Sequence, residues 1–202
     1  MRGDGCSMSR AFDLAYSSLK MQIVSGALRP GQHININTIA STIRISTSPM
    51  REALCTLSAE GLLESTKGSG FHVPLFEFTA VSDLLKWSDH LARQCVKAGK
   101  SQKAELVPRD VADHLSRVTI LFQGIGRMAG NAEIAKALTN AALRLNGLYR
   151  TELAFLPDAD DELDRIEDGL TVGAHNLPRL LHTFHRRRVA ILPKIMRAQK
   201  KQ

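Results

Sequence analysis

Two short amphipathic segments that are only a few residues apart constrain the fold of this chain most. In "INTIASTIR" (36–44) the apolar residues recur at spacings of three and four, which is the period of an α-helix. The next segment, "STSPMREALCTLSAEGLLES" (46–65), repeats that pattern and reaches a stop signal at Gly61. Two short helices joined in this way predict a helix-turn-helix. The buried stripe of the second helix is predicted to consist of Met50, Ala53, Leu54 and Leu57.

The second of these helices carries a cation near its start. Ser48 is a good N-cap and Pro49 suits the first helical position, which would place Arg51 third. A cation there is unfavourable by roughly 0.3–1 kcal/mol, because the free backbone N–H groups already make the helix start positive. A phosphate in front of the helix would reverse that sign, since Arg51 and the N–H groups would bind the same anion. The alternative is that Glu52 and solvent merely screen the charge.

The flanking segments complete a winged helix. A first amphipathic helix is predicted over 12–25, and Pro30 and Gly31 then mark a turn. After the helix-turn-helix, "LLESTKGSGFHVPL" (62–75) has two short β-type segments around "KGSG", whose glycines permit the positive φ of a tight hairpin. This small domain is predicted to end near Pro74.

These motifs carry a family resemblance. The segment "IASTIRISTSPMREALCTLSAEGLLESTKGSGFHV" resembles the DNA-binding domain of the GntR family of bacterial transcription regulators. Upstream, "AYSSLKMQIVSGALRPGQHI" is similar to the family's first helix and the turn after it, so the resemblance spans about residues 11–74. It implies that Arg51 contacts the DNA backbone and neighbouring bases, and that the tip of the wing enters the minor groove. The wing residues that this places near DNA are Lys67, Gly70 and His72.

Two positions in the turn depart from the family's pattern. Thr47 stands where the family usually has Arg, and Arg44 stands where it usually has Gly. Because this arginine is missing, we predict an operator that differs from the common family sequence. Arg44 would then contribute to the affinity for DNA in its place. The full set of residues that the resemblance implies for DNA contact is Arg44, Ser46, Thr47, Ser48, Arg51, Lys67, Gly70 and His72.

The second half of the chain favours a period of 3.6 residues throughout, and no segment alternates like a strand. Helices are predicted over 78–99, 109–128, 131–156, 158–173 and 177–198. The pattern resembles the FCD domain, the helical effector-binding bundle of the FadR branch of the same family. Its anchors are "LFQGIGRMAGN" and "GAHNLPRLLHTFHRRR". The predicted fold is therefore mostly α, with a flexible arm at 1–10, a winged helix-turn-helix at 11–76 and an all-α bundle at 79–202.

In the FCD domain a divalent metal is commonly held by one Asp and three His. By this resemblance, Thr119 stands at the position of the Asp, and Gln123 and Leu163 stand at the positions of the first two His. Only the position of the last His holds a matching residue, His185. The effector pocket would then be lined by Thr119, Gln123, Leu163 and His185. Because only one of the four matches the family's metal ligands, we predict that the metal site is lost and that no cofactor is held. Two other clusters, His182 with His185 and Asp110 with His114, are more typical of structural contacts. Thr119 and Gln123 would hydrogen-bond an effector, or form a core pair in a domain that only dimerises.

Composition sets outer limits on these interpretations. The net charge of +7 lies mainly in the C-terminal half, where 158–168 is acidic and 179–202 holds no acidic residue. Two segments of opposite sign are as readily explained by helices that pack side by side as by a polyanion. Three cysteines without a CxxC pair fit a reducing cytoplasm. The N-terminus lacks a hydrophobic signal region, and no run of 18 apolar residues predicts a membrane span.

Together these features predict a cytoplasmic, homodimeric transcriptional regulator, a repressor, that binds a double-stranded DNA operator. Its helical domain would respond to a small effector, an organic acid or related metabolite. No nucleophile elbow, P-loop or dinucleotide fingerprint indicates an enzyme. Two alternatives stay open: a DNA-binding regulator whose helical domain only dimerises, and a small-molecule-binding protein whose winged helix is an interaction module.

Overall fold

The computed structural model describes residues 4–75, 77–99, 113–173 and 175–199. The chain divides into two compact units, Met1–Leu75 and Phe76–Gln202. The first combines helices with a small hairpin and the second is helical throughout its described residues, which confirms the predicted mostly α fold class.

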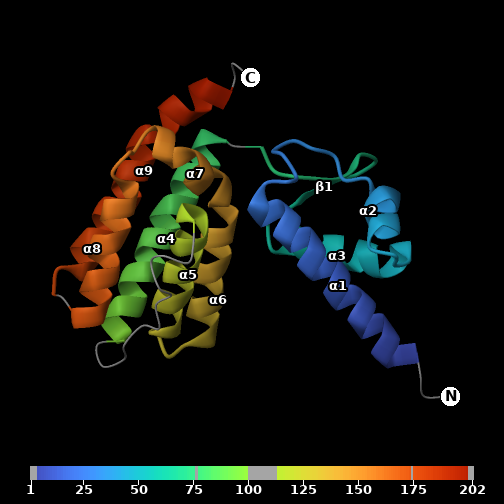
Figure 1. Ribbon diagram of the computed structural model, residues 1–202, viewed down its shortest axis with the longest axis horizontal. Helices are drawn as coiled ribbons and strands as arrows, with labels where there is room; N and C mark the ends of the chain where they lie inside the picture. The colour runs from blue at the N-terminus through green and yellow to red at the C-terminus, as the bar shows by residue number, and fades with distance from the viewer. Residues whose placement is uncertain (1–3, 76, 100–112, 174, 200–202) are drawn as a thin grey trace. The chain divides into compact units, whose positions relative to one another are not determined.

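The first unit is a three-helix domain closed by a hairpin. Its elements are α1 (Asp4–Ser25), α2 (Ile36–Thr42), α3 (Thr47–Ala59), β1 (Glu64–Thr66) and β2 (Gly70–His72). Helix α1 packs against α3 through fully buried side chains that include Leu19 of α1 and Leu54 of α3 (Figure 1). Residues 4–10, which were expected to belong to a flexible arm, form the first part of α1. The predicted stripe of α3 is confirmed, because Met50, Ala53, Leu54 and Leu57 are all fully buried.

The hairpin is short and depends on glycine. Strands β1 and β2 pair antiparallel, with Glu64 opposite His72, and the N–H of Ser69 donates to the Thr66 carbonyl at 3.0 Å to close the turn. Gly68 and Gly70 have φ of 83° and 77°, in the left-handed region that residues with a Cβ rarely adopt. A Cβ on Gly70 would also lie 2.9 Å from Nε2 of His33. The hairpin predicted around "KGSG" is therefore confirmed.

The second unit is a helical bundle. Helix α4 packs against α5, α6 and α9 and lies at the bundle's centre (Figure 1). The single helix predicted over 131–156 is wrong, because Leu145 ends one helix and begins another with ψ of −2°, well away from the helical value. Part of the helix predicted over 109–128 lies outside the described residues. The elements are α4 (Phe78–Ala98), α5 (His114–Arg127), α6 (Ala132–Arg144), α7 (Asn146–Thr151), the 3₁₀-helix η1 (Glu152–Ala154), α8 (Ala159–Val172) and α9 (Leu177–Gln199).

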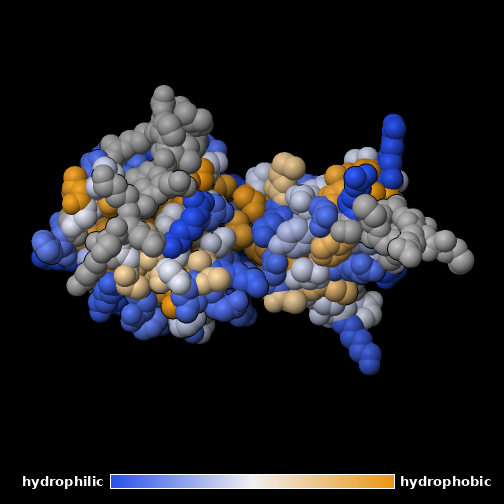
Figure 2. All heavy atoms as spheres, turned by 90° about the horizontal axis from the view of Figure 1, so that it is seen from below, coloured by the Kyte–Doolittle hydropathy of each residue, from blue (hydrophilic) through white to orange (hydrophobic). Residues whose placement is uncertain are grey.

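Exposed large apolar side chains are few and scattered. On the face drawn in Figure 2, hydrophobic residues form small separate patches among hydrophilic ones. Trp87 is half exposed on α4 and stacks on His90, with ring centroids 5.9 Å apart. Within the described ranges, no helix combines the length and the apolar character needed to cross a membrane.

Candidate functional site

The start of α3 presents an exposed surface of polar side chains and backbone N–H groups. The N-cap is Ser46, whose side chain makes no capping hydrogen bond, and the first turn contains no acidic residue. Thr47, Ser48 and Arg51 are all exposed. The first N–H groups of an α-helix have no partner within the helix, so this end can bind an anion.

The predicted cap at Ser48 is wrong by two residues. Ser46 is extended at φ −74° and ψ 163°, whereas Ser48 and Pro49 are the second and third residues of the helix. A proline is tolerated there because the N–H it lacks would have had no partner in the first turn. Arg51 thus falls in the second turn, beyond most of the unfavourable dipole effect. Its exposed position on the same side as Thr47 and Ser48 still lets it reach an anion at the helix start.

Arg44 occupies a backbone conformation that normally belongs to glycine. Its φ is 57°, and no other non-glycine residue within the described ranges has a positive φ. The left-handed conformation closes the turn between α2 and α3, where the N–H of Arg44 donates to the Ser41 carbonyl at 3.2 Å. A side chain there costs roughly 1–2 kcal/mol. The Arg44 side chain is exposed, so packing does not compensate for the strained backbone conformation. This favours a role for the guanidinium in binding.

We expect Arg44→Gly to raise the free energy of unfolding by about 0.5–1 kcal/mol, because relief of the strained conformation outweighs the extra backbone entropy of glycine. The same change should weaken binding to DNA, since it removes an exposed cation. Urea unfolding and DNA titration measure the two effects. Arg44→Ala is the matched control, because it removes the charge but keeps the Cβ and the strain. A glycine variant no more stable than the alanine variant would contradict this account.

The hairpin supplies the other part of the surface. Lys67 and Gly68 are exposed at its tip, and a Cβ on Gly68 would meet nothing within 4 Å. His72 is less exposed, and its Nε2 lies 3.3 Å from the Glu64 carboxylate. Lys67 and Gly70 are therefore free to approach a ligand, whereas His72 faces the neighbouring strand. Glu52 and Cys55 share the exposed side of α3 with Arg51, and neither was predicted from the sequence to contact DNA.

A polar contact fixes the far end of α3 on α1. The Tyr16 hydroxyl donates to the Glu60 carboxylate, at 2.7 Å from Oε1, and Lys20 donates to the Tyr16 oxygen at 2.7 Å. Burial raises the pKa of Tyr16, so the hydroxyl stays protonated as a donor. This contact and the apolar stripe hold α3 so that its exposed side stays available.

In the helical unit, the four positions implied for a metal do not fit one. His185 is 2% exposed; its Nδ1 donates to the Leu181 carbonyl at 2.8 Å and its Nε2 lies 3.0 Å from the Ser88 hydroxyl. Thr119 donates to the Leu115 carbonyl, and Leu163 is fully buried without a donor atom. Burial lowers the pKa of His185 to about 4, so its ring is neutral. Both nitrogens are already engaged, which leaves no lone pair for an ion.

A second histidine on α9, His182, is exposed and contacts the buried carboxylate of Asp89. His182 Nδ1 lies 2.9 Å from Asp89, which also receives two hydrogen bonds from Arg93. Burial alone would raise the pKa of Asp89, but the hydrogen bonds from His182 and Arg93 hold it below its usual value. His182 and His185 both approach this carboxylate, as a structural contact would. Asp110, the other candidate partner of a histidine, lies outside the described residues.

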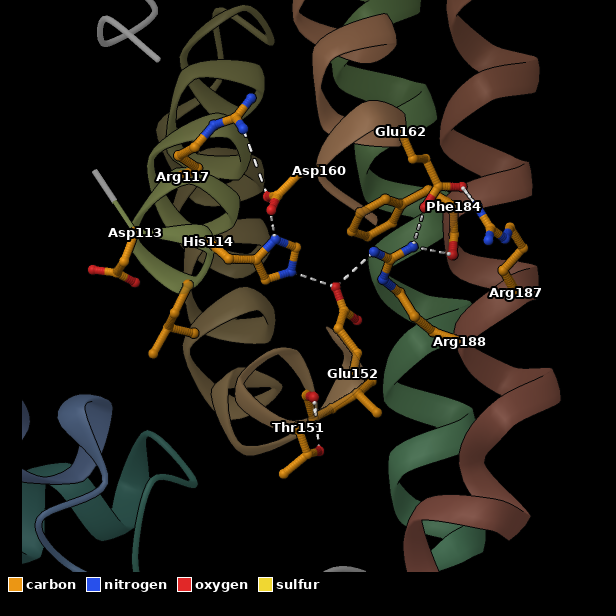
Figure 3. Close-up of polar contacts among 12 residues, drawn as sticks. Asp113, His114, Arg117, Thr151, Glu152, Asp160, Glu162, Phe184, Arg187 and Arg188 are labelled. Atoms are coloured by element: carbon orange, nitrogen blue, oxygen red, sulfur yellow. Dashed lines mark hydrogen bonds and ion pairs between the residues drawn. The ribbon is translucent and has the colours of Figure 1, made fainter. Parts of the chain in front are cut away.

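The described part of the helical unit contains a buried ion-pair network that was not predicted from the sequence. Arg188 is fully buried; it donates to Glu162 at 2.6 Å and to Glu152 at 2.7 Å, and its guanidinium carbon lies 3.2 Å from the centre of the Phe184 ring. Glu152 lies between Arg188 and the ring of His114, whose Nε2 is 2.7 Å away (Figure 3). This chain of contacts joins α5, η1, α8 and α9.

The network favours a protonated His114. Its Nδ1 lies 2.7 Å from Asp160, so both ring nitrogens face carboxylates. Burial alone would lower the pKa of His114, but the hydrogen bonds and charges of Glu152 and Asp160 outweigh burial and raise it. Arg117, one turn further along α5, pairs with Asp164 at 2.7 Å and Glu167 at 2.9 Å. Of the two explanations for the opposite charges at 158–168 and 179–202, helices that pack side by side agree with the contacts between α8 and α9.

The predicted effector residues lie beside this network but do not form it. Thr119 is 3.4 Å from the Asn146 side chain, and His185 packs edge-on to Phe122 with ring centroids 5.4 Å apart. Gln123 is half buried one turn from Thr119 on α5. Within the described part of the chain, no three His, Cys, Asp or Glu side chains are grouped to hold a metal ion.

The first unit has the fold and the exposed surface of a winged helix-turn-helix domain, a class of nucleic-acid-binding module. Residues 13–73 match the family described as bacterial regulatory proteins, gntR family. The first unit is therefore similar, over residues 13–73, to the domain that this family model describes. The Nta operon transcriptional regulator of Aminobacter aminovorans is 35% identical over 74 residues, which cover 37% of this chain and 35% of that protein. The chain spans about a third of the length of the curated relatives it matches.

Solved structures share the fold over both units. E. coli McbR/YncC is similar over 92% of this chain and 98% of that chain, with a TM-score of 0.69 and 17% identity. A GntR putative transcriptional regulator from Rhodococcus sp. RHA1 is similar over 90% and 96%, with a TM-score of 0.70 and 16% identity. At these identities the likeness establishes the fold alone.

Proposed function

We propose that this protein is a cytoplasmic transcriptional regulator, a repressor, that binds an operator as a homodimer and is not an enzyme. One observation carries the proposal: an α3 start that is exposed and has no side-chain cap and a glycine-dependent hairpin occur in one domain, which the GntR family model matches. Helix α3 would enter the major groove and the hairpin the minor groove, with each protomer at one half-site.

The DNA contacts are proposed to come from the exposed residues at the two ends of this surface. Arg51 and the N–H groups of α3 would bind phosphate and base edges, Arg44 would bind from the turn, and Lys67 would bind from the hairpin tip. Thr47 is exposed and short, so it would not contact the base that an arginine at this position contacts. Ser46, Ser48, Gly70 and His72 complete the proposed set, with His72 held back by its contact with Glu64.

The helical unit is proposed to form the dimer and to respond to a small effector without a metal. Its support is the pair Thr119 and Asn146 beside a buried polar network, together with the poor ligand set at the family's metal positions. A helical unit that only dimerises is the second candidate, favoured by the tight packing of His185.

DNA binding should be strongly salt-dependent. If Arg44, Arg51 and Lys67 of two protomers each meet a phosphate, log affinity should fall against log salt with a slope of about −5. Gel shifts over a salt series, with DNA selected from random sequence and a scrambled duplex as control, measure this slope and the specificity. The absence of a specific complex at moderate salt would refute the regulator and favour an interaction module.

A further inference from the structure

Three buried polar side chains form a line along one side of α7 and η1. Asn146, Tyr149 and Glu152 are three residues apart, so they share a helix face, and their exposed fractions are 3%, 0% and 0%. Within the described ranges, the Nδ2 of Asn146, the hydroxyl of Tyr149 and the Oε2 of Glu152 have no hydrogen-bond partner. Buried polar groups are nearly always paired, so three in a line require an explanation.

The line faces a fourth such atom on α9. The Nε of Arg188 is likewise buried without a partner, and Nη2 of the same guanidinium holds Oε1 of Glu152 at 2.7 Å. Phe184 connects this pair to Tyr149, because the guanidinium carbon of Arg188 lies 3.2 Å from the centre of the Phe184 ring and that ring packs against Tyr149. Burial raises the pKa of Tyr149, so its hydroxyl stays protonated. Phe122 and Phe184 border the same region, with ring centroids 6.5 Å and 6.1 Å from that of Tyr149.

The unpaired atoms define what a ligand must offer. Glu152 Oε2 only accepts, the nitrogens of Asn146 and Arg188 only donate, and the Tyr149 hydroxyl does either. A complementary ligand therefore presents an N–H and a carbonyl oxygen. Flanking aromatic rings suit a planar group that carries both.

Charge argues against a carboxylate ligand. Both terminal nitrogens of Arg188 already hold carboxylates, so an anion bound at the remaining Nε would lie close to two negative charges. Among the described residues, the ion pairs around Arg188 also involve more carboxylates than cations. The carboxylates are Glu152, Asp158, Asp160, Glu162, Asp164 and Glu167, and the cations are His114, Arg117, Arg187 and Arg188.

We propose that Asn146, Tyr149, Glu152 and Arg188 form a binding site for a small uncharged molecule with a carboxamide-type group, such as an amide, a urea or a lactam. This inference deepens the effector-sensing part of the proposed function and rests on it. It replaces the organic acid expected from the sequence with a neutral ligand. Buried water is the competing occupant, because one or two waters can also satisfy such atoms.

Matched amide and carboxylate probes test the site in the full-length protein. Acetamide, benzamide and nicotinamide are titrated beside acetate, benzoate and nicotinate, by calorimetry and by thermal unfolding. At least one amide should bind and raise the melting temperature, and should bind at least about tenfold more tightly than its carboxylate. Equal or tighter binding of the carboxylates would overturn the proposal. So would failure of all three amides, with a crystal structure showing only water on Glu152.

Tyr149→Phe supplies the specific variant, because it removes the hydroxyl and keeps the ring. It should weaken the bound amide about tenfold, whereas Tyr16→Phe, at the chain's only other tyrosine, should leave that affinity unchanged. An unchanged affinity in Tyr149→Phe would overturn the assignment. Gel shifts on the same preparations separate the two proposals. DNA binding without amide binding would refute only the amide site, and amide binding without DNA binding would refute only the transcriptional regulator.

Discussion

Arg51→Ala is expected to lower the affinity for operator DNA at least about 100-fold while the protein stays folded. One good contact from an arginine to a base contributes about 1–3 kcal/mol, and a dimer would lose two such contacts. Arg51 is exposed and the apolar stripe of α3 lies on the other side, so alanine removes no packing. Gel shifts measure the affinity, and circular dichroism with thermal unfolding checks the fold.

Two further variants separate charge from geometry at this position. Arg51→Lys keeps the cation but not the planar fork, so it should preserve binding to scrambled DNA and lose most of the preference for the operator. Arg186→Ala removes one exposed charge from α9 in the other unit and should change operator affinity by less than about threefold. Full operator affinity in Arg51→Ala would mean that another element enters the groove.

The first unit could be predicted closely because its signals are local. The apolar spacing of α2 and α3 and the glycines of the hairpin act over a few residues, and the structure reproduces both. The cap was misplaced because Ser46 and Ser48 are equally good candidates and Pro49 is tolerated anywhere in a first turn. The strain at Arg44 was visible in the sequence only as an arginine at a position where the family usually has glycine.

The buried network could be predicted only in part, because its contacts are remote in sequence. Opposite charges at 158–168 and on the last helix allowed either helix packing or a polyanion partner, and the structure shows ion pairs between the two segments. Nothing local indicates that His114 meets Glu152, a residue 38 positions away. The polar line on α7 did leave a signal, because Asn146, Tyr149 and Glu152 recur every third residue within an apolar segment.

Arg188→Met is expected to destabilise the helical unit by about 3–5 kcal/mol. Methionine fills much of the same volume, but it leaves Glu152 and Glu162 buried with their main cation gone. Breaking a buried ion pair from one side has this cost because the remaining charge stays away from water. Urea unfolding followed by fluorescence measures the change, since Trp87, the only tryptophan, lies on α4 of this unit.

Removing the whole charge cluster should restore most of that stability. In the triple variant Arg188→Met, Glu152→Gln, Glu162→Gln, no unpaired charge is left at the centre, and such replacements of buried ion pairs are often neutral or stabilising. His114 would lose one of the two carboxylates that raise its pKa, so recovery should be least complete below its pKa in the unfolded chain, where the protonated ring contributes most, and should improve as pH rises. Arg186→Met is the matched control at an exposed position of the same helix and should cost less than about 0.5 kcal/mol. A single variant as stable as this control would show that water reaches the carboxylates, and a triple variant no better than the single would assign the loss to packing around Phe184.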